Sequence, residues 1–153
     1  MYSRAYVEIT NICNMNCSFC HGHARPARKM TAAEFSHVLD ALEGKTKYVY
    51  YHLMGEPLSH PDLPLFLRKA RSRGFLSVIT TNGTLLHKHG QGLIDGGVHK
   101  VSISVHSFEG GDREKHESYV NQIELHLGLE VEYYPAYFDE LMERLRDTPV
   151  EYM

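Results

Sequence analysis

Residues 13–20 read Cys13-Asn14-Met15-Asn16-Cys17-Ser18-Phe19-Cys20 and contain all three cysteines of the chain. They follow an alternating apolar run, Tyr6-Val7-Glu8-Ile9-Thr10, which predicts a strand over residues 5–10. Three thiolates on one short loop can hold an iron–sulfur cluster, zinc or copper(I). A disulfide would leave one thiol over, and no fourth cysteine exists to close an all-cysteine site. An iron–sulfur centre here would therefore keep one iron without a protein thiolate.

Three later segments place glycine or polar residues at or just after strand-like runs. They are Tyr51-His52-Leu53-Met54-Gly55-Glu56-Pro57-Leu58, Ser77-Val78-Ile79-Thr80-Thr81-Asn82-Gly83-Thr84 and Lys100-Val101-Ser102-Ile103-Ser104-Val105-His106. The cysteine motif and these segments, taken in order, resemble the radical S-adenosylmethionine (SAM) enzymes over about residues 5–118. Met54 stands where that family has the first glycine of a Gly-Gly-Glu-Pro motif.

The resemblance implies a [4Fe-4S] cluster held by Cys13, Cys17 and Cys20, with SAM chelated to the open iron through its amino and carboxylate groups. It further implies contacts to the cofactor by residues at the matching motif positions: Phe19, Gly55, Glu56, Pro57, Asn82 and Ser104. The implied reaction is reductive cleavage of SAM to a 5'-deoxyadenosyl radical, which abstracts hydrogen from a substrate that the sequence does not identify. The implied electron donor is a reducing partner such as flavodoxin or ferredoxin.

Strand-like and helix-like runs alternate along the chain, which predicts βα units and a parallel sheet. The expected strands cover residues 5–10, 47–53, 75–80 and 101–106, and the expected helices cover residues 32–42 and 63–73 with a weaker one near Leu93. Thr31 and Glu34 form a capping-box pattern, and Gly74 closes the second helix. The fold expected is α/β, a partial (β/α) barrel of about four βα units where the family has six. A homo-oligomer or partner would complete such a barrel, or catalysis would be impaired.

The last part of the chain carries a second resemblance. Residues 123–153 are similar to a strand-helix-strand fragment of histidinol-phosphatase-type PHP metallohydrolases, which implies a division into a truncated core, 1–122, and a fragment, 123–153, packed on the sheet edge. Glu130 matches a metal ligand of that family, but the partner ligands have no counterpart here. The tail is therefore interpreted as a strand and an amphipathic helix over residues 137–145.

The composition restricts the function further. The chain has 153 residues and a net charge of -3 without long blocks of like charge, so no nucleic-acid surface is indicated. No apolar run approaches the ~18 residues of a membrane span, and no secretory segment opens the chain, so a cytoplasmic protein is expected. The basic group Arg25, Arg28 and Lys29 is interpreted as a solvated connection into a helix.

Other functions remain open from the residues alone. The chain is either a radical SAM enzyme or a catalytically inactive remnant that binds the cluster. A zinc-binding module is a third possibility, because His21 or His23 can complete a tetrahedral site with the three cysteines. A PHP-type phosphatase is the weakest candidate.

Overall fold

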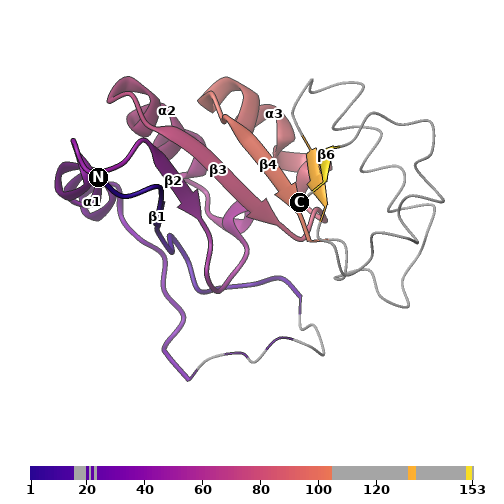
Figure 1. The fold of residues 1–153 in the computed structure, drawn as a ribbon. Helices are drawn as coiled ribbons and strands as arrows, with labels where there is room; N and C mark the ends of the chain where they lie inside the picture. The colour runs from indigo at the N-terminus through magenta and orange to yellow at the C-terminus, as the bar shows by residue number, and fades with distance from the viewer. Residues whose placement is uncertain (16–19, 21, 23, 105–130, 134–150, 153) are drawn as a thin grey trace.

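The computed structural model describes residues 1–15, 20, 22, 24–104, 131–133 and 151–152 (Figure 1). Within these residues six strands form one sheet in the order β1-β2-β3-β4-β5-β6, and every neighbouring pair is parallel. The strands are β1 (Ala5–Tyr6), β2 (Tyr48–Tyr51), β3 (Leu76–Thr81), β4 (Lys100–Ile103), β5 (Val131–Tyr133) and β6 (Glu151–Tyr152). The predicted α/β class and partial parallel barrel are thus confirmed.

Helices connect the successive strands of the first half of the sheet. They are α1 (Ala32–Leu42), α2 (Leu63–Ser72) and α3 (Leu86–Gly96), and Figure 1 shows all three on the same side of the sheet. The predicted capping box opens α1: the Glu34 amide donates to Thr31 Oγ1 at 3.2 Å, and the Thr31 amide donates to the Glu34 carboxylate at 2.8 Å. The capping residues therefore define where the segment after the cysteines becomes helical.

The first strand is shorter than the alternation predicted. Only Ala5 and Tyr6 form the β1 ladder with β2, although the Val7 amide still donates to the Tyr50 carbonyl at 2.9 Å. Thr10 instead forms an isolated antiparallel bridge with Lys29. The apolar alternation continues past the ladder because Val7 and Ile9 still pack in the core. Periodicity reports which face a residue occupies, whereas the ladder ends where the backbone bonds to another segment.

The core lies between the helices and one face of the sheet. Phe35 of α1 stacks on Phe66 of α2 with ring centroids 4.4 Å apart, and Tyr51 of β2 packs beside Phe35. The Tyr51 hydroxyl is hydrogen-bonded to Ser77 Oγ at 3.0 Å, so this buried phenol has a polar partner. Burial raises the pKa of Tyr51, and the phenol therefore stays protonated.

The tail contributes β5 and β6 to the edge of the sheet. Val131 pairs with Val101 of β4, and Tyr152 of β6 pairs with Tyr133 of β5. The helix expected over residues 137–145 lies outside the described residues, so the division of the chain at residue 122 stays a prediction. Among the described residues, no helix has the length and apolar character needed to cross a membrane.

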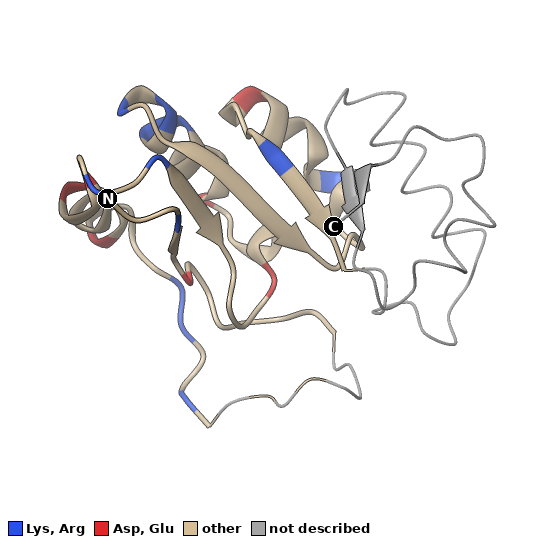
Figure 2. Ribbon diagram, in the orientation of Figure 1, with Lys and Arg blue, Asp and Glu red and all other residues tan. Residues whose placement is uncertain are grey.

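The basic residues of the described segments do not gather into one stripe. Figure 2 shows them spread over α2, the start of β4 and the segment that leads into α1. Two of the ion pairs lie at the surface, Arg28 with Glu34 and Arg73 with Asp40. The absence of a nucleic-acid partner stays a prediction.

Candidate functional site

The segments that follow β1, β2 and β3 meet at the carboxyl edge of the sheet. The Glu56 amide, after β2, donates to the Ile12 carbonyl, after β1, at 2.8 Å. The Asn82 side chain, after β3, donates to Asn14 Oδ1 at 2.9 Å. Figure 1 shows the described part of the segment after β1 continuing past the tip of the β2 arrow. Because parallel strands all end at the same edge, motifs far apart in sequence converge here.

Gly55 permits the closest of these approaches. Its φ of +83° lies in the left-handed region, and a Cβ atom there would be 2.4 Å from the Thr10 carbonyl oxygen and 2.9 Å from the Asn11 carbonyl carbon. A side chain at this position would therefore collide with the backbone of the β1 loop. Met54, which occupies the family's first glycine position, is half-buried, and its amide donates to Glu8 Oε2 at 3.0 Å.

Glu56 joins the turns after β2 and β3. Its carboxylate is 2% exposed, and it accepts hydrogen bonds from Thr81 Oγ1 at 2.7 Å, the Asn82 amide at 2.8 Å and the Leu58 amide at 3.0 Å. Burial raises the pKa of Glu56, and these three hydrogen bonds oppose the rise. The buried carboxylate thus organises the edge of the site, and its role as an acceptor for SAM stays a prediction.

Asn82 connects the β3 turn to the cysteine segment. Its Nδ2 lies 4.0 Å from Cys13 Sγ, while its Oδ1 accepts from Thr84 Oγ1 at 2.7 Å and from the Thr84 amide at 3.0 Å. Asn14 Nδ2 in turn donates to Thr84 Oγ1 at 2.9 Å. An amide N–H directed at a cysteine sulfur stabilises the thiolate form and tunes any metal that the sulfur binds.

The thiols suit a thiolate-bound metal as far as the structure describes them. Cys13 and Cys20 are both exposed, and Cys13 has the Asn82 amide beside it. Cys17 and Phe19 lie outside the described residues. Without Cys17, the described residues contain no group of three His, Cys, Asp or Glu side chains that could hold a metal ion. The donors present therefore fit a thiolate cluster, and the ligand set of three cysteines stays a prediction.

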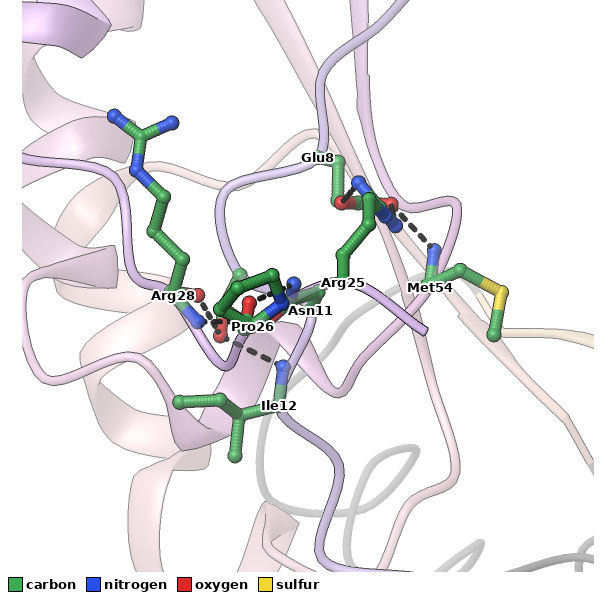
Figure 3. Close-up of polar contacts among 8 residues, drawn as sticks. Glu8, Asn11, Ile12, Arg25, Pro26, Arg28 and Met54 are labelled. Atoms are coloured by element: carbon green, nitrogen blue, oxygen red, sulfur yellow. Dashed lines mark hydrogen bonds and ion pairs between the residues drawn. The ribbon is translucent and has the colours of Figure 1, made fainter. Parts of the chain in front are cut away.

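The two arms of the cysteine segment are joined at their base. Asn11 Nδ2 donates to the Pro26 carbonyl at 2.8 Å, and the Arg28 amide donates to Asn11 Oδ1 at 2.8 Å (Figure 3). Thr10 Oγ1 also donates to the Arg28 carbonyl at 3.1 Å. We call this set of contacts the neck. The neck fixes where the chain leaves the sheet toward Cys13 and where it returns.

A second connection lies beside the neck. Arg25 Nη1 and Nη2 donate to the two carboxylate oxygens of Glu8 at 2.6 and 3.1 Å, and Oε2 also accepts from the Met54 amide (Figure 3). The hydrogen bonds that Arg25 donates to Glu8 raise the pKa of Arg25. Sequence reasoning missed this pair because it treated Arg25 as a solvated residue. A charged residue between Val7 and Ile9, just before the cysteine motif, was the available signal.

The remaining predicted cofactor contacts lie at the same edge. Pro57 begins the 3-10 helix Pro57–Ser59 and is buried. Ser104 follows β4, is half-buried, and its amide donates to the Thr81 carbonyl at 2.8 Å. The structure brings Gly55, Glu56 and Asn82 together with the Cys13 arm, and contacts of all these residues with a cofactor stay predictions. His106 lies outside the described residues.

Comparison with known proteins identifies similar chains. A family model described as the radical SAM superfamily matches residues 7–150. The AdoMet-dependent heme synthase of Methanosarcina barkeri (strain Fusaro / DSM 804) is 33% identical over 116 residues, 73% of this chain and 32% of the relative. The GTP 3',8-cyclase of Chlorobaculum tepidum is 30% identical over 116 residues, 73% of this chain and 34% of the relative. The chain thus spans about a third of these relatives' length.

Solved structures show the same architecture. SeMet BtrN in an open conformation has a TM-score of 0.60 at 27% identity. The match covers 75% of this chain and 54% of the BtrN chain. SuiB of Streptococcus suis bound to S-adenosylmethionine has a TM-score of 0.78 at 17% identity. This match covers 97% of this chain and 39% of the SuiB chain. The second likeness concerns the fold alone.

Proposed function

The chain belongs to the radical SAM superfamily, and from that premise we propose that it binds a [4Fe-4S] cluster through Cys13, Cys17 and Cys20 and cleaves SAM reductively to abstract hydrogen from a substrate. The observation that supports this most directly is the meeting of three motif-bearing loops at one sheet edge, with the Asn82 amide beside Cys13. Family membership implies the cluster and SAM as cofactors and SAM-dependent radical chemistry in general.

The hard chemistry belongs to the cofactors. Cys13, Cys17 and Cys20 would hold the cluster, which would supply the electron for reductive cleavage of SAM and so the radical chemistry that removes hydrogen from a substrate. The chain itself has to hold the thiolates, orient SAM and keep water away.

The described residues suit those tasks. Asn82 directs an amide donor at the Cys13 sulfur, and the buried Glu56 holds the β2 and β3 turns in one arrangement. The predicted contacts of Gly55, Pro57, Ser104 and Phe19 with SAM complete the proposal. A preorganised edge of this kind positions a cofactor without reorganisation at the moment of reaction.

The proposal extends to partners and to the tail. An electron donor such as flavodoxin or ferredoxin would reduce the cluster, and a second copy or another protein would complete the barrel. The tail, residues 123–153, would serve as a fragment added at the edge of the core, where β5 and β6 extend the sheet. The relatives named above act on different molecules, so no substrate is proposed.

The test is anaerobic reconstitution with iron and sulfide, followed by electron paramagnetic resonance of the dithionite-reduced protein with and without SAM. We expect a cubane signal that changes when SAM is added and is lost in Cys17→Ala. Production of 5'-deoxyadenosine under the same conditions separates an enzyme from an inactive cluster-binding remnant.

Metal analysis of the purified protein tests the alternative of a zinc site. Stoichiometric zinc with no cluster signal after reconstitution would refute the radical proposal and leave a metal-binding module of the three cysteines with His21 or His23.

A further inference from the structure

Glu8 contacts two segments that belong to different motifs. One carboxylate oxygen accepts from Arg25, five residues after Cys20, and the other accepts both from Arg25 and from the backbone amide of Met54, next to Gly55 (Figure 3). The Glu8 side chain is 16% exposed, whereas that of Arg25 is 55% exposed. One half-shielded carboxylate therefore bridges the returning cysteine arm and the β2 turn.

The geometry of the bridge makes it more than an ordinary surface ion pair. An isolated exposed pair contributes little, because solvent screens it and the side chains lose entropy. Here the guanidinium binds both carboxylate oxygens, and this fork geometry restricts direction as well as distance. The bond from Met54 has a backbone donor on a turn that is already fixed by the Gly55 contact with Thr10.

The neck does not provide this connection. The contacts that define it run from the side chains of Thr10 and Asn11 to Pro26 and Arg28, and so join the two arms of the cysteine segment to each other. The Glu8 side chain, in contrast, links the returning arm directly to the turn after β2. Removing the Glu8 carboxylate would leave the neck intact and would remove this direct link between the returning arm and the turn.

We propose that Glu8 is a positioning residue, which clasps the cysteine arm through Arg25 to the Met54 turn and so sets the spacing between the cluster thiolates and the edge where SAM binds. The clasp consists of contacts within this chain, whereas its consequence for SAM rests on the proposed function. Arg25 is the second half of the clasp and acts through Glu8.

The first experiment measures amide hydrogen exchange in the full chain without metal. In Glu8→Gln we expect exchange at the Met54 amide to speed up by about three- to tenfold, the range for replacing a charge-assisted bond by a neutral one. The Phe35 amide, inside α1, reports global opening and should keep its rate. Arg28→Gln is the matched control, because Arg28 lies on the same arm but pairs with Glu34.

A charge reversal distinguishes the bridge from a simple ion pair. The double variant Glu8→Arg with Arg25→Glu restores opposite charges but provides no acceptor at position 8 for the Met54 amide. We expect the Met54 amide to exchange at least as fast in this double variant as in Glu8→Gln. Full recovery of protection would contradict the bridging role.

The second experiment uses the reconstituted protein and the SAM-dependent change in its paramagnetic resonance signal. In Glu8→Gln and in Arg25→Gln we expect the SAM concentration for half the spectral change to rise by about three- to tenfold, with unchanged iron content. Arg28→Gln should respond like wild type.

The outcomes separate the two proposals. If wild type forms no cluster, the proposed function fails, while the exchange of Met54 still tests the clasp. If Met54 exchanges equally in Glu8→Gln, Arg28→Gln and wild type, the clasp is wrong. If exchange rises but the SAM response of a loaded Glu8→Gln protein equals that of wild type, the positioning role is refuted.

Discussion

Gly55 and Glu56 are adjacent residues that hold the site edge in different ways. Gly55 lets the β2 turn approach the backbone of the β1 loop, and Glu56 binds the turn after β3 from a buried position. The family motif places both residues here, but only contacts between segments show what each one does.

Gly55→Ala should be strongly destabilising. The added methyl combines a positive φ with a collision against the Thr10 carbonyl oxygen, so we expect a loss of about 2–4 kcal/mol in the free energy of unfolding. Gly44→Ala is the control, since Gly44 also has a positive φ, of +73°, but no heavy atom within 4 Å of its Cβ position.

Urea unfolding of both variants gives the two losses. The control Gly44→Ala should lose only the free energy needed to hold alanine in a left-handed backbone conformation, about 1–2 kcal/mol. Equal losses in the two variants would show that the β1 and β2 loops do not approach each other closely in solution.

Glu56 should make stability depend on pH in an unusual direction for a carboxyl group. Burial raises its pKa above the ordinary value of 4.5, so between the two values the folded state binds more protons than the unfolded chain. The stabilisation that this protonated carboxyl contributes to the free energy of unfolding is therefore complete below about pH 4.5. It is lost as the pH rises through the pKa of Glu56 in the folded state.

Glu56→Gln removes that titration. We expect the stability advantage of wild type over the variant to be largest near pH 4 and to shrink toward pH 7, by about 1.4 kcal/mol for each unit of pKa difference. Urea midpoints measured across this range test the prediction. A difference that stays constant or grows with pH would show that the carboxyl pKa is not raised.

At the scale of elements, α1, α2 and β2 meet through aromatic rings. Phe66 of α2 stacks on Phe35 of α1 and also lies 4.8 Å, ring centroid to centroid, from His60 before α2. The His60 ring bridges the Met30 carbonyl and the Asp62 amide. One ring of α2 therefore packs on the helix that follows the cysteine arm and on the segment after the Glu56 turn.

Phe66→Ala should cost about 3–5 kcal/mol of stability, because the site is completely buried and tightly packed. Tyr2→Ala is a matched aromatic control, since Tyr2 is 69% exposed and should change stability by less than about 0.5 kcal/mol. Thermal and urea unfolding give both values, and a small loss in Phe66→Ala would mean that the core relaxes around the missing ring.

At the scale of the whole molecule, the two faces of the sheet differ in kind. Val101 and Ile103 pack in the core beneath the helices, as the alternation predicted. The other face carries Tyr6, whose ring lies 5.4 Å from Tyr50 and 5.3 Å from His52 between centroids. Burial lowers the pKa of His52, which favours its neutral form, and the Arg4 guanidinium carbon lies 5.2 Å from the centroid of the Tyr50 ring on the same surface.

Local signals predicted the elements well. The capping box at Thr31 begins α1, and the αL glycine Gly74 follows α2, because both signals depend on neighbours within four residues. The strand bounds were less accurate, since a ladder depends on the partner strand: residues 9–11 bond to 28–30 and leave β1 with two residues.

The sequence by itself determined the family and the order of the βα units, and it predicted which residues carry the chemistry, because motif spacing and hydrophobic period are properties of neighbouring residues. Only the tertiary structure decided that Glu56 is a buried link, that Asn82 faces Cys13 and that Glu8 joins Arg25 to Met54. These contacts join residues 17 to 69 positions apart. No local rule specifies such pairs, since they form only when parallel strands bring their ends to one edge.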